Sequence, residues 1–248
     1  SYSLLARDSF LTTMLLAVIG SICIYFIIDF FYLFQQTEEV ALLSKPYLKL
    51  LMWSLSPMLL FFFAKNVTDG FSYTIGGMTI TLLALGINVF LNWVLIFGHL
   101  GFDAYGLNGA GYATIISRIF LAVAMVLTML FSSKVPIDFG SFIRSFSASY
   151  RITFFKRIII LGFPTGLQYF FEIAAFAAAA IMAGWIGAKE LAAHNLAITL
   201  ASLTYMFASG VSAGASICVA KAHGNSNLRD VIEYGKKVVK FPLEYDCI

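Results

Sequence analysis

Glu172 is an ionisable residue in the middle of a long apolar stretch of the sequence, Ile158–Ile186. If that stretch crosses a membrane as a helix, the carboxyl group lies near mid-membrane. Acids at that depth are costly to bury and usually mark the path of an ion or a substrate, so Glu172 could carry a proton or hold a cation. Gln168 stands one helical turn earlier on the same face. The alternative is a structural hydrogen bond to a neighbouring helix.

Two further pairs of polar residues are spaced by four positions inside apolar stretches. Asn88 and Asn92 form one pair, and Thr114 and Arg118 form the other, so each pair points to one side of a helix. Together they could line a polar pocket. Polar side chains in membranes also tie helices together, and spacing alone favours that second interpretation. Arg118 is expensive at membrane depth unless it is paired or reaches an aqueous surface.

Motifs typical of enzymes and metal sites are missing from the sequence. There is no nucleophile elbow, HExxH pair or Walker loop, and Gly106–Gly111 is no dinucleotide fingerprint because no strand precedes it. The three cysteines, Cys23, Cys218 and Cys247, form no CxxC pair or ligand cluster. We therefore expect no enzyme activity, no metal site and no organic cofactor.

Composition indicates the elements that position these residues. Hydrophobic residues make up 60% of the 248 residues and charged residues 12%, whereas soluble domains usually carry about 25% charged residues. Six apolar segments are long enough to approach or exceed the roughly 20 residues that span a bilayer. Backbone groups inside a bilayer must be satisfied within each segment, which predicts an all-α membrane helix bundle. The predicted spans are Ser9–Leu33, Tyr47–Phe63, Tyr73–Phe97, Tyr105–Phe131, Ile158–Ile186 and Leu191–Ala220.

The basic residues predict which connections face the cytoplasm. If the N-terminal end is cytoplasmic, twelve of the sixteen lysines and arginines fall on that side, and only Lys45, Lys49 and Lys189 fall outside. This asymmetry is a strong positive-inside signal. The net charge of +3 is modest and forms no separate patch, so we expect membrane lipids as partners and no nucleic acid.

The connection between the fourth and fifth spans divides the chain. We expect a four-helix group in residues 1–131, a cytoplasmic linker in residues 132–157, and a second group in residues 158–248. The linker is basic and rich in serine and phenylalanine. It could lie along the membrane surface or be a solvated segment, and the sequence leaves both open.

Three stretches resemble the multidrug and toxic compound extrusion (MATE) transporters. Asn88–Ser117 (NVFLNWVLIFGHLGFDAYGLNGAGYATIIS) resembles their fifth-to-sixth helix region. Leu161–Phe176 (LGFPTGLQYFFEIAAF) resembles the seventh helix, and Leu191–Ala222, with AAHN and GVSAGAS, resembles the eighth. The resemblance implies two six-helix lobes in the inner membrane, a cleft between them, and export of small organic cations in exchange for H⁺ or Na⁺.

The resemblance also assigns roles to individual residues. Glu172 falls on the seventh-helix carboxylate that couples cation and substrate. Asn88, Asn92 and Thr114 match polar positions of the N-lobe cation site, where the position of Asn92 is an acid in some members. In the family another acid comes from the first helix.

The six predicted spans match helices three to eight of twelve, with the beginning of a ninth. This leads us to expect an incomplete chain that is inactive by itself. Two alternatives remain. One is a lipid-linked oligosaccharide flippase of the same superfamily, which the scarcity of intramembrane basic residues disfavours. The other is a membrane protein that transports nothing.

Overall fold

A computed structural model describes residues 2–29, 38–136, 139–146, 152–224, 232, 233 and 235. Every regular element in these ranges is an α-helix, which confirms the all-α prediction. The helices are α1 (Tyr2–Asp29), α2 (Glu38–Gly70), α3 (Thr74–Phe97), α4 (Gly106–Phe131), α5 (Phe139–Ser145), α6 (Ile152–Ile186) and α7 (Ala188–Gly224). They form two compact units: unit 1 is Ser1–Arg151 and unit 2 is Ile152–Ile248.

Six of the described helices are long and apolar enough to cross a membrane, as predicted. The helices extend beyond the apolar runs. The run Tyr47–Phe63 lies inside α2, which continues to Gly70 past Lys65 and Asp69. Intrahelical hydrogen bonds do not depend on side-chain polarity, and long charged side chains at a span's end can reach the aqueous surface. The apolar runs therefore identified the spans but underestimated some of the helices.

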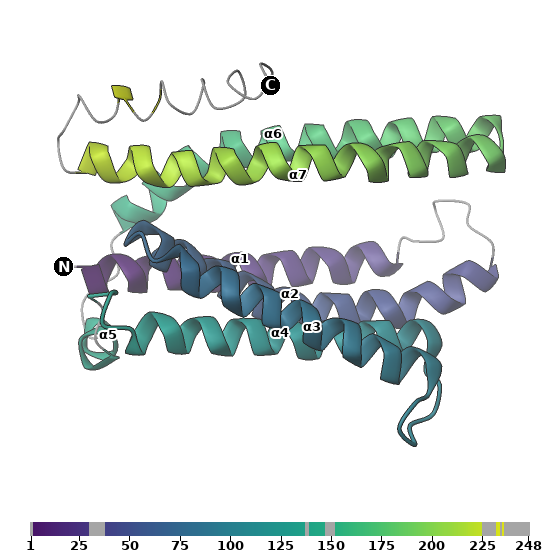
Figure 1. Ribbon diagram of the computed structural model, residues 1–248, viewed down its shortest axis with the longest axis horizontal. Helices are drawn as coiled ribbons and strands as arrows, with labels where there is room; N and C mark the ends of the chain where they lie inside the picture. The colour runs from purple at the N-terminus through teal and green to yellow at the C-terminus, as the bar shows by residue number, and fades with distance from the viewer. Residues whose placement is uncertain are drawn as a thin grey trace, which may run out of the picture. The chain divides into compact units, whose positions relative to one another are not determined.

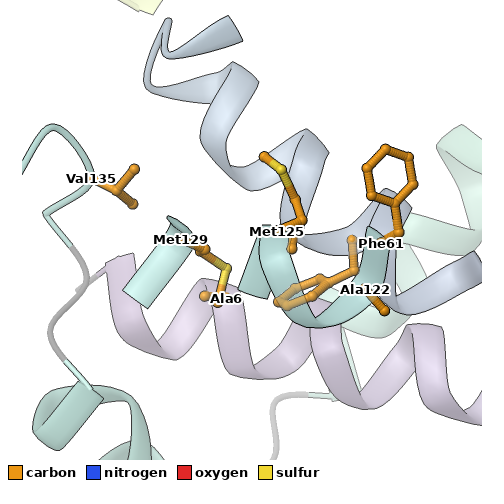
Figure 2. Close-up of a cluster of buried hydrophobic side chains, with 8 residues drawn as sticks. Ala6, Phe61, Ala122, Met125, Met129 and Val135 are labelled. Atoms are coloured by element: carbon orange, nitrogen blue, oxygen red, sulfur yellow. The ribbon is translucent and has the colours of Figure 1, made fainter. Parts of the chain in front are cut away.

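Four long helices make up most of unit 1. In Figure 1, α1 to α4 run side by side, and the closest packing joins α2 to α4, α3 to α4 and α1 to α2. A cluster of buried apolar side chains lies where α1 begins and α2 and α4 approach their ends (Figure 2). This is the end predicted to be cytoplasmic. Its members are Ala6, Phe61, Phe63, Ala64, Ala122, Met125, Met129 and Val135.

The short helix α5 packs against α1 through a buried arginine. Arg7 and Asp8 form an ion pair in which Arg7 is 1% exposed and Asp8 is fully buried. The same guanidinium donates a hydrogen bond to the carbonyl oxygen of Ser145, at the last residue of α5. Phe142 and Phe146 pack edge-on against Phe10 of α1. Part of the predicted linker is therefore attached to unit 1, while residues 137–138 and 147–151 lie outside the described part.

Two glycines allow α4 to lie close to its neighbours. A side chain at Gly109 would collide with the backbone carbonyl group of Leu95 on α3. At Gly111 a Cβ atom would come 2.7 Å from the side chain of Leu50 on α2. Small residues of this kind let membrane helices approach each other closely. The glycine-rich string at the start of α4 is thus explained by helix packing.

Unit 2 contains two long helices joined at a single residue. Gly187 lies between α6 and α7, and its N–H group donates to the carbonyl oxygen of Ala183. The two helices pack against each other (Figure 1). α6 continues without interruption through Pro164. The stretch after residue 224, which the resemblance assigns to the start of a ninth helix, lies outside the described residues apart from 232, 233 and 235.

Candidate functional site

Glu172 stands at the midpoint of the span Ile158–Ile186, as the sequence predicts. Its side chain is half-buried, although the apolar window of that span contains no buried residue. α6 is helical from Ile152 to Ile186, so both ends of the span lie about 21 Å from Glu172 at 1.5 Å per residue. The carboxyl group is therefore placed far from both ends of the span.

Tyr205 of α7 is the partner of Glu172. The two side chains are close enough for the charge of the Glu172 carboxylate to act on the Tyr205 phenol. A phenol can donate to an ionised carboxylate, so in a hydrogen bond between the two the Tyr205 hydroxyl would be the donor. Tyr205 is itself at the middle of its span, Lys189–Ala222, and is 54% exposed. The α6–α7 hairpin thus carries a carboxylate and a phenol together at mid-span.

The sequence reasoning did not select Tyr205. A usable signal was present, because a hairpin with a one-residue turn brings positions at similar distances from that turn opposite each other. Tyr205 is the only tyrosine between residues 188 and 224. Gln168, which was selected, is exposed on α6 one turn before Glu172.

The two asparagines predicted to act together do contact each other in unit 1. Asn92 Nδ2 donates to Asn88 Oδ1 at 2.9 Å. Asn88 Nδ2 donates in turn to the hydroxyl of Ser117 on α4 at 3.2 Å, and Ser117 is 5% exposed. This chain of hydrogen bonds ties α3 to α4. The side-chain oxygen of Asn92, Oδ1, is buried and has no hydrogen-bond partner among the described atoms.

Thr114 and Arg118 are directed elsewhere. The Thr114 hydroxyl donates to the carbonyl oxygen of Ala110 on its own helix at 2.8 Å. Arg118 Nη1 donates to the hydroxyl of Ser54 on α2. The structure therefore brings Asn88 and Asn92 together, adds Ser117, and gives Thr114 and Arg118 separate contacts.

The chemistry available to the two centres differs. Glu172 can gain or lose a proton or bind a cation, because a carboxylate is both a base and a hard oxygen ligand. The amides of Asn88 and Asn92 offer neutral oxygens that can ligate a cation but cannot carry a proton near neutral pH. Among the described residues, no group of three histidine, cysteine, aspartate or glutamate side chains is arranged to hold a metal ion.

Long apolar helices with an ionisable group at mid-span define a multi-pass membrane protein. Residues 3–94 and 164–243 match the MatE family, and the chain belongs to it. This confirms the resemblance found in the sequence. It also agrees with the expectation that the chain is no enzyme, because the MATE proteins are transporters.

Relatives named "probable multidrug resistance protein NorM" support the assignment. The chain is 34% identical to that of Halalkalibacterium halodurans over 207 residues, which are 83% of the chain and 44% of the relative. It is 32% identical to that of Agrobacterium fabrum over 79% of the chain and 42% of the relative. For Geobacillus kaustophilus the identity is 31%, over 88% of the chain and 47% of the relative. The chain spans less than half the length of these relatives.

Proposed function

We propose that these helices form part of a secondary active antiporter that exports small organic cations in exchange for H⁺ or Na⁺. The observation that carries the proposal is the Glu172–Tyr205 pair at mid-span in the α6–α7 hairpin. The relatives' names support a role in drug efflux. The activity is proposed for a transporter with two complete lobes, located in the inner membrane and working without an organic cofactor.

Exchange of two cations follows when they compete for a single negative charge. An unprotonated Glu172 offers one carboxylate to a cationic cargo molecule, and a bare carboxylate at that depth is costly. Binding of H⁺ or Na⁺ also neutralises the carboxylate, so cargo and coupling ion compete for the same charge. Competition at one site is sufficient for antiport when the site faces the two sides alternately. Tyr205 would hold the carboxylate in place, and Gln168 would contribute a neutral polar contact one turn away.

The asparagine cluster in unit 1 has a secondary role in this proposal. Asn88 and Asn92 supply neutral oxygens, which suit Na⁺ as ligands but offer no proton acceptor, and Thr114, whose hydroxyl donates to the carbonyl oxygen of Ala110, would have to turn toward them to join the set. The free oxygen of Asn92 supports this assignment. If the cluster acts in coupling, Asn92→Ala should reduce efflux driven by Na⁺ and leave efflux driven by H⁺ unchanged.

Everted membrane vesicles containing the full-length transporter test the proposal. Uptake of a fluorescent organic cation is measured with a H⁺ gradient or a Na⁺ gradient imposed separately. Glu172→Gln should abolish driven uptake, and Glu172→Asp, which keeps the charge, should retain a part of it. Membrane insertion of each variant is checked by its abundance and melting temperature. Undiminished gradient-driven uptake by the glutamine variant would remove Glu172 from the mechanism.

A further inference from the structure

Arg118 is a permanently charged residue in the middle of α4. The helix spans Gly106–Phe131, so at 1.5 Å per residue Arg118 lies about 18 Å from its nearer end. A guanidinium group keeps its charge under all ordinary conditions. Charged side chains at such depth face the interior of a bundle or a water-filled cavity and are usually paired. The Glu172 site described above does not use this charge.

The guanidinium is held toward α2 by Ser54. Ser54 is fully buried, and its hydroxyl donates to the carbonyl oxygen of Leu51 at 2.7 Å while accepting from Arg118. The preceding residue, Ser117, is bonded to Asn88 of α3 instead. Two adjacent residues of α4 thus face two different neighbours. Arg118 is directed at the α2–α4 contact, where a buried hydroxyl fixes its position.

A single neutral hydroxyl does not compensate this charge. A guanidinium has five N–H donors. In the part of the chain that the structure describes, its side-chain hydrogen bond goes to Ser54, and the ion pairs formed there involve Arg7 and Lys65. Arg118 is half-buried at mid-span, where a charge is unfavourable unless it is paired, so an anion would complete its remaining donors.

A carboxylate fits this requirement better than a phosphate. Its two oxygens match the fork of donors, and its single negative charge gives a pair with no net charge. A phosphate with two charges would leave one uncompensated. Lipid phosphates also lie at the two ends of the span, far from Arg118.

We infer that Arg118, which Ser54 holds in place, is a binding position for a carboxylate in unit 1. The carboxylate belongs either to a zwitterionic cargo molecule or to another segment of the transporter that packs on α2 and α4. The first source rests on the proposed export function and would place the carboxylate of a zwitterionic cargo molecule at this residue.

Binding of two matched dyes to the full-length transporter in detergent tests this inference. One is a rhodamine with a free carboxylic acid, and the other is its methyl ester, so the dyes differ in one negative charge. Affinities are measured by fluorescence polarisation for the parent protein, Arg118→Gln and Arg118→Lys. Arg144→Gln is the control, because Arg144 is exposed on α5. Gradient-driven uptake of the ester dye by the parent tests the proposed function separately.

A cargo carboxylate predicts selective loss of one dye. Arg118→Gln should weaken binding of the acid dye about tenfold or more and leave the ester dye within about twofold, a difference of about 1.4 kcal/mol. A carboxylate of the transporter itself predicts that Arg118→Gln weakens both dyes equally and that Arg118→Lys restores much of the binding. Parent-like binding of both dyes by Arg118→Gln overturns the inference. Equal losses for both dyes in the glutamine and lysine variants also overturn it, because the charge would then not be the property required.

Discussion

Unit 1 and unit 2 are built from the same kind of long apolar helix, yet they treat their polar residues differently. In unit 1 the polar side chains are drawn into helix contacts: Arg7 and Asp8 are buried, Asn88 reaches Ser117, and Arg118 reaches Ser54. In unit 2 the apolar windows of both spans contain no buried residue, and Glu172 is matched with a largely exposed tyrosine.

This difference distinguishes polar residues that stabilise helix contacts from polar residues that are available to bind an ion or a ligand. A neutral amide or hydroxyl that forms a hydrogen bond between two packed helices stabilises their contact, and the bonded atoms are then no longer available to an ion or a ligand. A carboxylate on a two-helix hairpin remains available for an ion or a ligand. The comparison predicts that changes in unit 1 lower stability more than activity, and that changes at the hairpin centre do the reverse.

The largest effect on stability is expected for Arg7→Ala. Removing one partner of a buried ion pair leaves an uncompensated charge, which typically costs about 3–5 kcal/mol. The substitution also frees the last carbonyl group of α5. The unfolding free energy of the full-length protein in detergent is the measurement. Lys65→Ala is the matched comparison, because Lys65 is 36% exposed although Asp69 is buried, so its loss should be smaller than that of Arg7→Ala. Equal losses for both variants would show that the Arg7–Asp8 pair is no stronger than the half-exposed Lys65–Asp69 pair.

Tyr205→Phe is expected to impair function without impairing stability. If the Tyr205 hydroxyl orients the Glu172 carboxylate by donating to it, its removal should lower the apparent affinity for the exported cation about tenfold or more, because a hydrogen bond to a charged group contributes about 1.5–3 kcal/mol. Cation-dependent uptake curves in vesicles measure this change. Tyr112→Phe in unit 1 should leave both affinity and melting temperature unchanged, because its ring contact with Tyr105 does not involve the hydroxyl. An unchanged affinity in Tyr205→Phe would contradict the proposed role of the Tyr205–Glu172 pair.

The same substitution at two glycines should have opposite effects in the two units. Gly109→Ala forces a methyl group against the backbone of Leu95 and should cost about 1–3 kcal/mol, as overpacked sites do. Gly166→Ala meets open space on α6 and should be neutral or stabilise the helix by up to about 1 kcal/mol. Comparison of the two melting temperatures tests whether close packing is confined to unit 1.

The smallest effect is expected for Asn88→Ala. Loss of the hydrogen bond to Ser117 should lower stability by about 0.6–2 kcal/mol, the range for polar contacts between membrane helices. Efflux driven by a H⁺ gradient should persist, since an amide carries no proton. Abolished H⁺-driven efflux with a parent-like melting temperature would give unit 1 the coupling role assigned here to unit 2.

The sequence predicts the six spans and the helical class because long apolar runs leave few other structures in a membrane. It also predicts the position of Glu172 at mid-span and the placement of Asn88 and Asn92 on one side of their helix, which depend on local helical spacing. Tyr205 could have been found from the one-residue turn of the α6–α7 hairpin, whereas the partners Ser54 and Ser145 could not be predicted in this way. Each comes from a different helix, and its identity depends on how the helices rotate and shift against each other. The close approach at Gly109 is likewise invisible until α3 is in place.

The central claim is that Glu172 is the one charge for which the exported cation and the coupling ion compete. It is tested most directly by measuring how acidification and added Na⁺ each affect the affinity of the full-length transporter for a fluorescent organic cation. In the parent protein at least one of these changes should weaken binding competitively. In Glu172→Gln the residual binding should respond to neither change. The same competitive response in the glutamine variant would contradict the account, because the competition would then take place at another residue.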